Sequence, residues 1–399
     1  MRISTANSYN ASIETLTNRQ QDLYEAQNQL TTGYRVNKAS DDPAAAARSE
    51  RALASIARTE ATKRAVDASQ TAMSQTEGAL SDAGDLLQQA REALVAAGNA
   101  TYTDAERADQ AKQLRQIRTQ LLSVANRADA SGNYMFGGQG ATSAPFVDAP
   151  GGVQWRSVAG EVKVSADESL PTSIDGQGAW MQARTGNGVF VTQSASTNAG
   201  GAWIDSGTVS NAQALTGSSY QVQFSVNAGV TTYSVMKDGV ATAASNQPYT
   251  SGQQIQVDGM SFAVTGVPAN GDSFGTVPST PTLSVFDVLD KAAAALEIPL
   301  RSSGQIAQTN NESIRDLDAV MGKLQSTRSA VGDTLNRIES ASGRLSDAKL
   351  AAETENANAI GLDEVKAISD YKTKESSFDA ALKSYAMVQR LSLFNYVNG

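Results

Sequence analysis

The chain has 399 residues, a formal net charge of −9, and neither cysteine nor histidine. Its length predicts two or three domains, and its acidic balance argues against a nucleic-acid binder. Disulfides and Ser–His or Cys–His nucleophiles are impossible, and a structural zinc site is disfavoured. We therefore expect no catalytic site of these kinds and no metal or cofactor site, and our main hypothesis is a protein that is not an enzyme.

The N-terminus, MRISTANSYN, lacks the apolar region of a cleavable secretion signal. No run of about 18 apolar residues occurs, so membrane insertion is not expected. If the protein leaves the cell, it uses a route that needs no such signal.

The first predicted helix covers residues 4–31 and ends before Gly33, which suits a left-handed stop. Gln20 and Gln27 fill the two gaps in its narrow apolar stripe. The large residues of that stripe are Tyr9, Ile13, Leu16, Leu23 and Leu30.

A second helix is predicted from Pro43 to about Gly98, with Asp42 as its N-cap. A cap explains the pair Asp41 and Asp42 better than acid–base or metal chemistry does. A third helix begins at the capping-box sequence 103–106 and is expected to end near residue 132.

Residues 137–285 hold 21 of the 32 glycines, 7 of the 9 prolines and all three tryptophans. This composition predicts strands and turns. The alternation of SYQVQFSV (219–226) indicates a half-buried strand, and Asp258-Gly259 between two apolar runs indicates a hairpin. Further strands are predicted at GVFVTQ and VTTYSVM.

Helices return after the β-rich part. A short helix is predicted at 284–296, and a long one carries a heptad pattern from 314 to 352, in which nine of twelve seam positions are apolar. A last helix runs almost to the C-terminus. Its apolar stripe consists of Phe378, Leu382, Tyr385, Val388, Leu391, Phe394 and Val397.

The predicted fold class is α+β. The N- and C-terminal helices pair into an antiparallel coiled-coil stem, and a β-rich outer domain is inserted between them. The predicted boundaries are a three-helix N-terminal stem at 1–136, the β-rich outer domain at 137–282 and a C-terminal helical stem at 283–399.

An isolated helix of the length of 9–30 is marginal in water, so its stripe needs another helix. The C-terminal stripe is the natural partner. Four apolar residues lie off both stripes and indicate contacts with additional chains: Tyr24, Val36, Leu393 and Tyr396. A self-contained helical bundle is the alternative, and the pattern alone leaves both open.

Several segments resemble the flagellin superfamily, most of all its hook–filament junction proteins. They are the opening MRIST, TTGYRVNKASDDPAAAAR (31–48), NYMFGG (133–138), PANGDSF (268–274) and SYAMVQRLSLFNYV (384–397). The resemblance implies a structural adaptor of the bacterial flagellum. Such proteins form a ring that joins the hook, through hook-associated protein 1, to the filament of flagellin.

The same resemblance implies export through the flagellar type III channel to the extracellular flagellum, with an export chaperone on the C-terminal helix. Helices at both termini would form the inner tube. The residues predicted to mediate subunit assembly are Tyr9, Ile13, Leu16, Leu23, Leu30, Leu382, Tyr385, Leu391, Leu393, Phe394, Tyr396 and Val397. The predicted cap and assembly loop is Ser40, Asp41, Asp42 and Pro43.

Two alternatives to the junction role are a filament-forming flagellin and a secreted β-domain hydrolase or glycan-binding protein. The second would use tryptophans and carboxylates of the middle region. These are Trp155, Trp180 and Trp203, with Asp167, Glu168, Asp175 and Asp272. No pair of these carboxylates has a spacing typical of a glycosidase.

Overall fold

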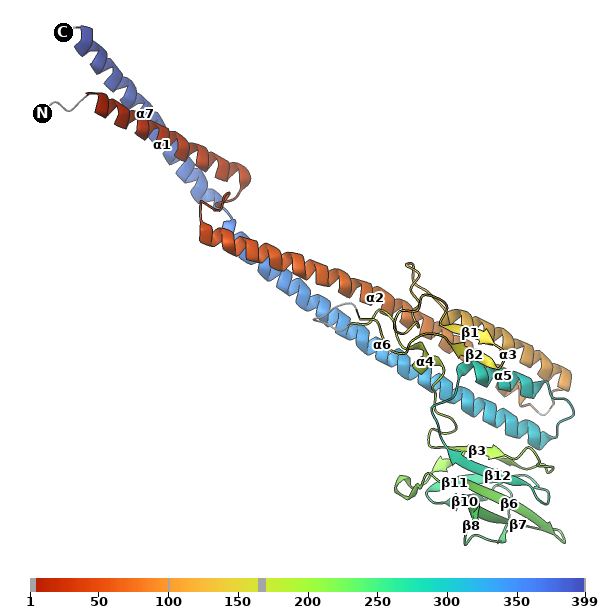
Figure 1. Cartoon of the computed structure of the whole chain (residues 1–399). Coiled ribbons are helices and arrows are strands. Elements are labelled where there is room, and N and C mark those ends of the chain that lie inside the picture. Colours follow the sequence, from red (N-terminus) through yellow and green to blue (C-terminus); the bar gives the residue numbers. More distant parts are fainter. Residues whose placement is uncertain (1–4, 100, 164–169, 398–399) are drawn as a thin grey trace. The chain divides into compact units, whose positions relative to one another are not determined.

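The computed structural model describes residues 5–99, 101–163 and 170–397, with side chains for 9–387 and 389 inside those ranges (Figure 1). Long helices stand at both ends of the sequence, and antiparallel strands occupy its middle (Figure 1). The predicted fold class, α+β with terminal helices that pair and a β-rich insertion, is confirmed.

The seven helices of the described residues and one short 3₁₀ turn have the following bounds: α1 Thr5–Thr32, α2 Pro43–Ala97, α3 Asp104–Ala125, α4 Gly176–Trp180, η1 Ala212–Ala214, α5 Val285–Leu296, α6 Ser303–Ile360 and α7 Glu364–Val397. The strands are β1 Phe146–Ala149, β2 Gly152–Trp155, β3 Phe190–Ser194, β4 Trp203–Ile204, β5 Thr208–Val209, β6 Tyr220–Asn227, β7 Val230–Lys237, β8 Val240–Ala241, β9 Gln247–Pro248, β10 Gln254–Val257, β11 Met260–Thr265 and β12 Ser273–Pro278.

Contacts divide the chain into two compact units. Unit 1 contains residues 1–64 and 342–399, and unit 2 contains residues 65–341. The domain boundaries expected at 136/137 and 282/283 stay a prediction. Among the described residues, no helix is both long enough and apolar enough to cross a membrane.

Helices α2 and α6 are antiparallel partners. In unit 1, Lys349 Nζ lies 2.8 Å from Glu60 Oε1, and in unit 2, Arg328 Nε lies 2.7 Å from Glu77 Oε1. All twelve predicted seam positions of α6 are buried or half-buried, so the heptad pattern is confirmed. Arg328 and Lys349 occupy two of the polar positions of this pattern, and each forms an ion pair with a glutamate on α2.

Helix α3 begins as predicted, since Thr103 and Glu106 form a complete capping box. It ends at Ala125, about two helical turns (3.6 residues each) before the expected stop. The amide of Asn126 binds both the N–H and the C=O of Phe146, at 3.0 and 2.7 Å. These bonds hold the chain to β1 and divert it from the helix.

An aromatic cluster in unit 2 fixes the segment after α3 onto α5. Trp180 is completely buried and stacks on Phe286, with ring centroids 6.0 Å apart. Phe136 meets Trp180 edge to face, and Phe146 contacts both Trp155 and Phe286. Two of the three tryptophans are therefore packing residues.

The β domain, which we define as strands β3 to β12, is built on a sheet in the order β3-β12-β6-β7-β8. Buried Phe190, Phe224, Phe262 and Phe274 are members of its core. The predicted hairpin is confirmed: β10 and β11 pair around Asp258 and Gly259, both with positive φ. Strands β3, β6 and β7 also match the predicted ones.

The β domain is held against α6 at three points. Gln308 Oε1 accepts the Ile204 N–H at 2.8 Å, and an N–H of Arg315 donates to the Thr192 C=O at 3.0 Å. A Cβ on Gly304 would lie 2.3 Å from the Gly201 oxygen, so the two backbones approach as closely as glycine permits.

Glu312 lies on α6 beside this anchor, where Gln308 Nε2 donates to its Oε1 at 2.5 Å. Burial raises the pKa of the Glu312 carboxyl above its ordinary value, against the opposing effects of Gln308 and Arg315. A raised folded-state pKa favours the folded protein while the group is protonated. That contribution is lost as the pH rises through the folded-state pKa.

We expect Glu312→Gln to become more stable relative to the parent as the pH rises from about 4 to about 7, because the amide carries no buried charge. Thermal unfolding followed by circular dichroism across this pH range measures the difference. Glu339→Gln, at an exposed position on the same helix, is the control. A melting-temperature difference between Glu312→Gln and the parent that does not change with pH contradicts the assignment.

Candidate assembly surface

Helices α1 and α7 of unit 1 lie side by side and antiparallel (Figure 1). At one end of the pair, the Tyr385 hydroxyl donates to the Tyr9 hydroxyl at 2.7 Å, and their rings are 5.7 Å apart. At the other end, the Leu362 N–H donates to the Gly33 C=O at 3.2 Å. The two ends of the sequence therefore pair as predicted.

The register of α1 differs from the prediction. Ala26 is buried and Ser12 is half-buried, whereas Gln20, Gln27 and Ile13 are exposed. The inward face thus follows Ser12, Leu16, Leu23, Ala26 and Leu30, rather than a stripe through the glutamines. The small side chains of Ser12 and Ala26 lie on this inward face, which the pattern of large residues did not predict. Only small side chains fit where the two helices are close together.

On α7, the half-buried residues recur at heptad spacing, with Tyr371, Lys374, Phe378, Ala381 and Tyr385. Leu382, which the predicted stripe includes, is 40% exposed. The side chains of Val388, Leu391, Leu393, Phe394, Tyr396 and Val397 lie outside the described side chains.

Unit 1 has almost no large side chain in its interior. Among its described side chains, the buried ones are Ala26, Val36, Ala45, Ser49, Ala52, Ala352 and Ala359. None of the leucine, isoleucine, methionine or aromatic side chains that the structure describes in this unit is buried. Unit 2, by contrast, buries several phenylalanines and leucines.

Apolar side chains of the pair instead remain exposed to solvent. Tyr24 of α1 is 72% exposed, and Met387 of α7 is 61% exposed. Tyr9 and Ile13 are each 38% exposed. Tyr24 thus has the exposure expected of a residue that contacts another chain, whereas Val36, from which we expected the same, is buried at 8% exposure and unavailable for such a contact.

A groove of about 590 Å³ runs between the two helices. Its walls carry small side chains, which are Ala11, Ser12 and Thr15 from α1 and Ser377, Ala380, Ala381 and Ser384 from α7. Arg19 and Tyr385 complete the lining. A groove of this composition accepts the side-chain ridge of another helix.

The loop between α1 and α2 is tied to the loop between α6 and α7. The Arg35 N–H donates to the Ile360 C=O at 2.8 Å, and the Arg35 guanidinium reaches the Ala359 C=O at 2.8 Å. The same side chain lies 3.2 Å from Asp42 Oδ2. Arg35 therefore joins the loop between α1 and α2 to the end of α6, a role that sequence reasoning missed because Ala359 is 324 residues away along the chain.

The predicted loop residues have distinct tasks. Asp42 Oδ1 accepts the Ala45 N–H at 3.0 Å, so Asp42 caps α2 just before the exposed Pro43. Asp41 instead accepts the N–H groups of Asn37 and Lys38 at 3.0 and 2.8 Å. The Ser40 hydroxyl donates weakly to Asp41 at 3.4 Å.

Both carboxylates are favoured in their charged form. The pKa of Asp41 is lowered chiefly by the Lys38 N–H, and the pKa of Asp42 by the Ala45 N–H and by Arg35. Because these pKa values are lowered, the contacts stabilise the loop at pH values above the ordinary pKa range of aspartate. They weaken as the pH falls through the folded-state values.

Comparison with known proteins agrees with this architecture. Residues 3–141 match the bacterial flagellin N-terminal helical region. The flagellar hook-associated protein 3 of Escherichia coli is 25% identical over 406 residues, which covers 99% of each chain. This chain is similar to hook-associated protein 3 along its whole length. The predicted resemblance is confirmed.

A solved structure gives the same result. The flagellar junction protein FlgL of Legionella pneumophila is 26% identical, with a TM-score of 0.66, and the match covers 73% of this chain and 98% of that one. The flagellar filament 41 kDa core protein of Borreliella burgdorferi is 27% identical, but over 30% of this chain and 36% of that protein. Full-length similarity is therefore to the hook-associated protein.

We expect Arg35→Ala to loosen the paired loops, because it removes the bond to Ala359 and the ion pair with Asp42. Hydrogen–deuterium exchange should quicken at residues 33–42 and 359–363 and stay unchanged in the β domain. Arg58→Ala, which removes an exposed arginine of α2, is the matched control. Unchanged exchange in the two loops would show that Arg35 does not join them.

Proposed function

We propose that this chain is a structural adaptor of the bacterial flagellum that forms the junction ring between hook and filament. Its full-length similarity to hook-associated protein 3 supports the assignment. The partners are then further copies of the chain, hook-associated protein 1 on the hook side and flagellin on the filament side. The role is mechanical, and no catalytic step is part of it.

The observation that carries the proposal is the interior of unit 1, where the described side chains that are buried include alanines and one valine but no larger apolar residue. Burying one large apolar side chain contributes roughly 1.5–3 kcal/mol, whereas ordering each backbone residue costs about 1–2 kcal/mol. Helical hydrogen bonds offset only part of that cost. Unit 1 therefore needs neighbours to become rigid.

Neighbouring copies supply the missing contacts in a ring. The exposed apolar residues of α1 and α7 are placed to meet them, and the small-residue groove is shaped for a helix of the adjacent copy. In this scheme Leu16, Leu23, Leu30 and the Tyr9–Tyr385 contact hold the pair together. The exposed Ile13 and Leu382, with the C-terminal residues Leu391, Leu393, Phe394, Tyr396 and Val397, contact the next copy.

Before assembly, this surface needs protection. We propose that an export chaperone covers the C-terminal helix, whose last turns carry Leu391, Leu393, Phe394 and Tyr396. The chain then leaves through the flagellar channel, which requires no cleavable signal, and its final place is the extracellular flagellum.

The alternatives are weaker. A filament-forming flagellin is disfavoured, because the filament protein matches less than a third of the chain. A β-domain hydrolase or glycan-binding protein as the main role is disfavoured too, since Trp180 is core and Asp272 is buried under three backbone N–H groups. Asp175 caps α4. Asp167 and Glu168 lie outside the described residues.

We expect hydrogen–deuterium exchange of the dilute monomer to be fast in α1 and α7 and slow in the unit 2 part of α6. The reason is that the large buried side chains, within the part of the chain whose side chains are described, all lie in unit 2. Incorporation into assembled junctions should slow exchange in α1 and α7 strongly. Equal protection of the terminal helices before and after assembly would contradict coupled folding and assembly.

Deletion of residues 1–30 or 380–399 should abolish incorporation into the junction, because either removes one helix of the pair. The β domain should remain folded, as judged by its circular dichroism and melting. Electron microscopy of hooks from a strain that lacks the native gene and expresses each truncated chain gives the readout. Hooks that bear filaments normally would refute the proposal.

Ala380→Trp should block assembly while leaving the monomer folded, because the indole fills the groove without replacing a buried residue. We expect hooks without filaments and at least a tenfold loss of swimming cells. Ala243→Trp, the same substitution at an exposed position of the β domain, is the control and should swim normally. Normal filaments on Ala380→Trp cells would show that the groove takes no part in assembly.

A further inference from the structure

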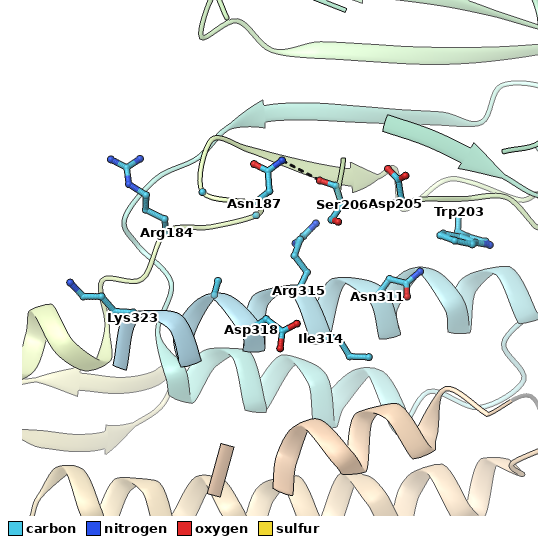
Figure 2. A pocket seen from close by; sticks show the side chains of 13 residues that line it. Arg184, Asn187, Trp203, Asp205, Ser206, Asn311, Ile314, Arg315, Asp318 and Lys323 are labelled. Atoms are coloured by element: carbon cyan, nitrogen blue, oxygen red, sulfur yellow. Dashed lines mark hydrogen bonds between the residues drawn. The ribbon is translucent and has the colours of Figure 1, made fainter. Parts of the chain in front are cut away.

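A cleft of about 800 Å³ in unit 2 lies between the β domain and α6 (Figure 2). Its volume falls in the range typical of small-ligand sites. In Figure 2, Arg184 and Lys323 lie at one end of the cleft and Trp203 at the other, next to Asn311. Nothing in the junction role uses this cleft, so its chemistry calls for a separate explanation.

Two charged residues of the cleft are already paired. Arg315 bonds Asp316 and the Thr192 C=O, and Asp318 bonds Arg91 of α2 at 2.8 Å. These contacts leave the charges of the middle of the cleft neutralised within the protein.

The end of the cleft that carries Arg184 and Lys323 differs from the middle, because its charges are not paired within the described part of the protein. Among the described residues, neither Arg184 nor Lys323 has an acidic partner, although Lys323 is half-buried on α6. Two unpaired cations at the same end of a cleft attract a carboxylate, and an arginine can hold one in a bidentate manner. This end of the cleft therefore suits a ligand that bears an acidic group.

The opposite end offers an aromatic face and hydroxyl-binding groups. Trp203 is half-exposed, unlike the fully buried Trp180. Asp205 Oδ1 accepts the N–H groups of Gly207 and Ala263, and its Oδ2 has no donor among the described residues. The Asn311 amide is exposed and likewise has no partner there.

We propose that this cleft binds an acidic saccharide. Its sugar ring stacks on Trp203, its hydroxyl groups bond Asp205 Oδ2 and the Asn311 amide, and its carboxylate lies between Arg184 and Lys323. A sugar hydroxyl both donates and accepts, so it satisfies the carboxylate and the amide together. An acidic peptide of the same charge lacks these hydroxyl groups.

The test uses the full chain and tetragalacturonate as the probe, with isothermal titration calorimetry and tryptophan fluorescence as readouts. We expect saturable one-to-one binding that quenches Trp203. Binding should weaken roughly tenfold or more in Arg184→Ala/Lys323→Ala and in Trp203→Ala, and less in Trp203→Phe. Lys291→Ala/Arg337→Ala removes two exposed cations elsewhere and should bind like the parent.

Two further probes separate the possible ligands. Maltotetraose, which is neutral, and tetraglutamate, an acidic peptide, should each bind at least tenfold more weakly than tetragalacturonate. No binding of tetragalacturonate, or binding that survives both the double substitution and Trp203→Ala, overturns the proposal. Tighter binding of tetraglutamate overturns it in favour of a peptide site. None of these variants touches α1 or α7, so their swimming stays normal whichever result is found.

Discussion

A pair of helices can shield only one narrow face of each from water, and this limit governs unit 1. The inward faces of α1 and α7 are filled by small and half-exposed residues, so the pair gains little from burial. What holds it together in the single chain is the tyrosine contact at one end and the loop hydrogen bonds at the other. Such a pair gains rigidity when further helices cover its exposed apolar residues.

Unit 2 has the opposite character. The aromatic cluster around Trp180 and the β-domain core bury large side chains, and the β domain is seated on α6 by Gln308, Arg315 and the Gly201–Gly304 approach. This unit has the interior of an independent folding unit. The two units therefore differ in how far their own side chains can stabilise them.

Sequence reasoning performed best where a local rule decides the outcome. The caps at Asp42 and Thr103, the hairpin at Asp258-Gly259 and the α6 heptads each depend on residues within one or two turns, and all are present. It performed worst where a contact between residues far apart in the sequence determines where a helix ends or which face it buries. Asn126 ends α3 early because it binds Phe146, and the register of α1 follows Ala26 rather than the glutamines because α7 approaches closely.

By itself, the sequence determined the helices at both ends, the β-rich insertion, the antiparallel pairing and the resemblance to the flagellin superfamily, because periodicity, capping and composition are local properties of the chain. Tertiary structure alone decided that Arg35 joins two loops, that two of three tryptophans are packing residues, and that Trp203 shares a cleft with Arg184 and Lys323. Each of these depends on residues far apart in sequence, and no pattern along the chain records which of them meet.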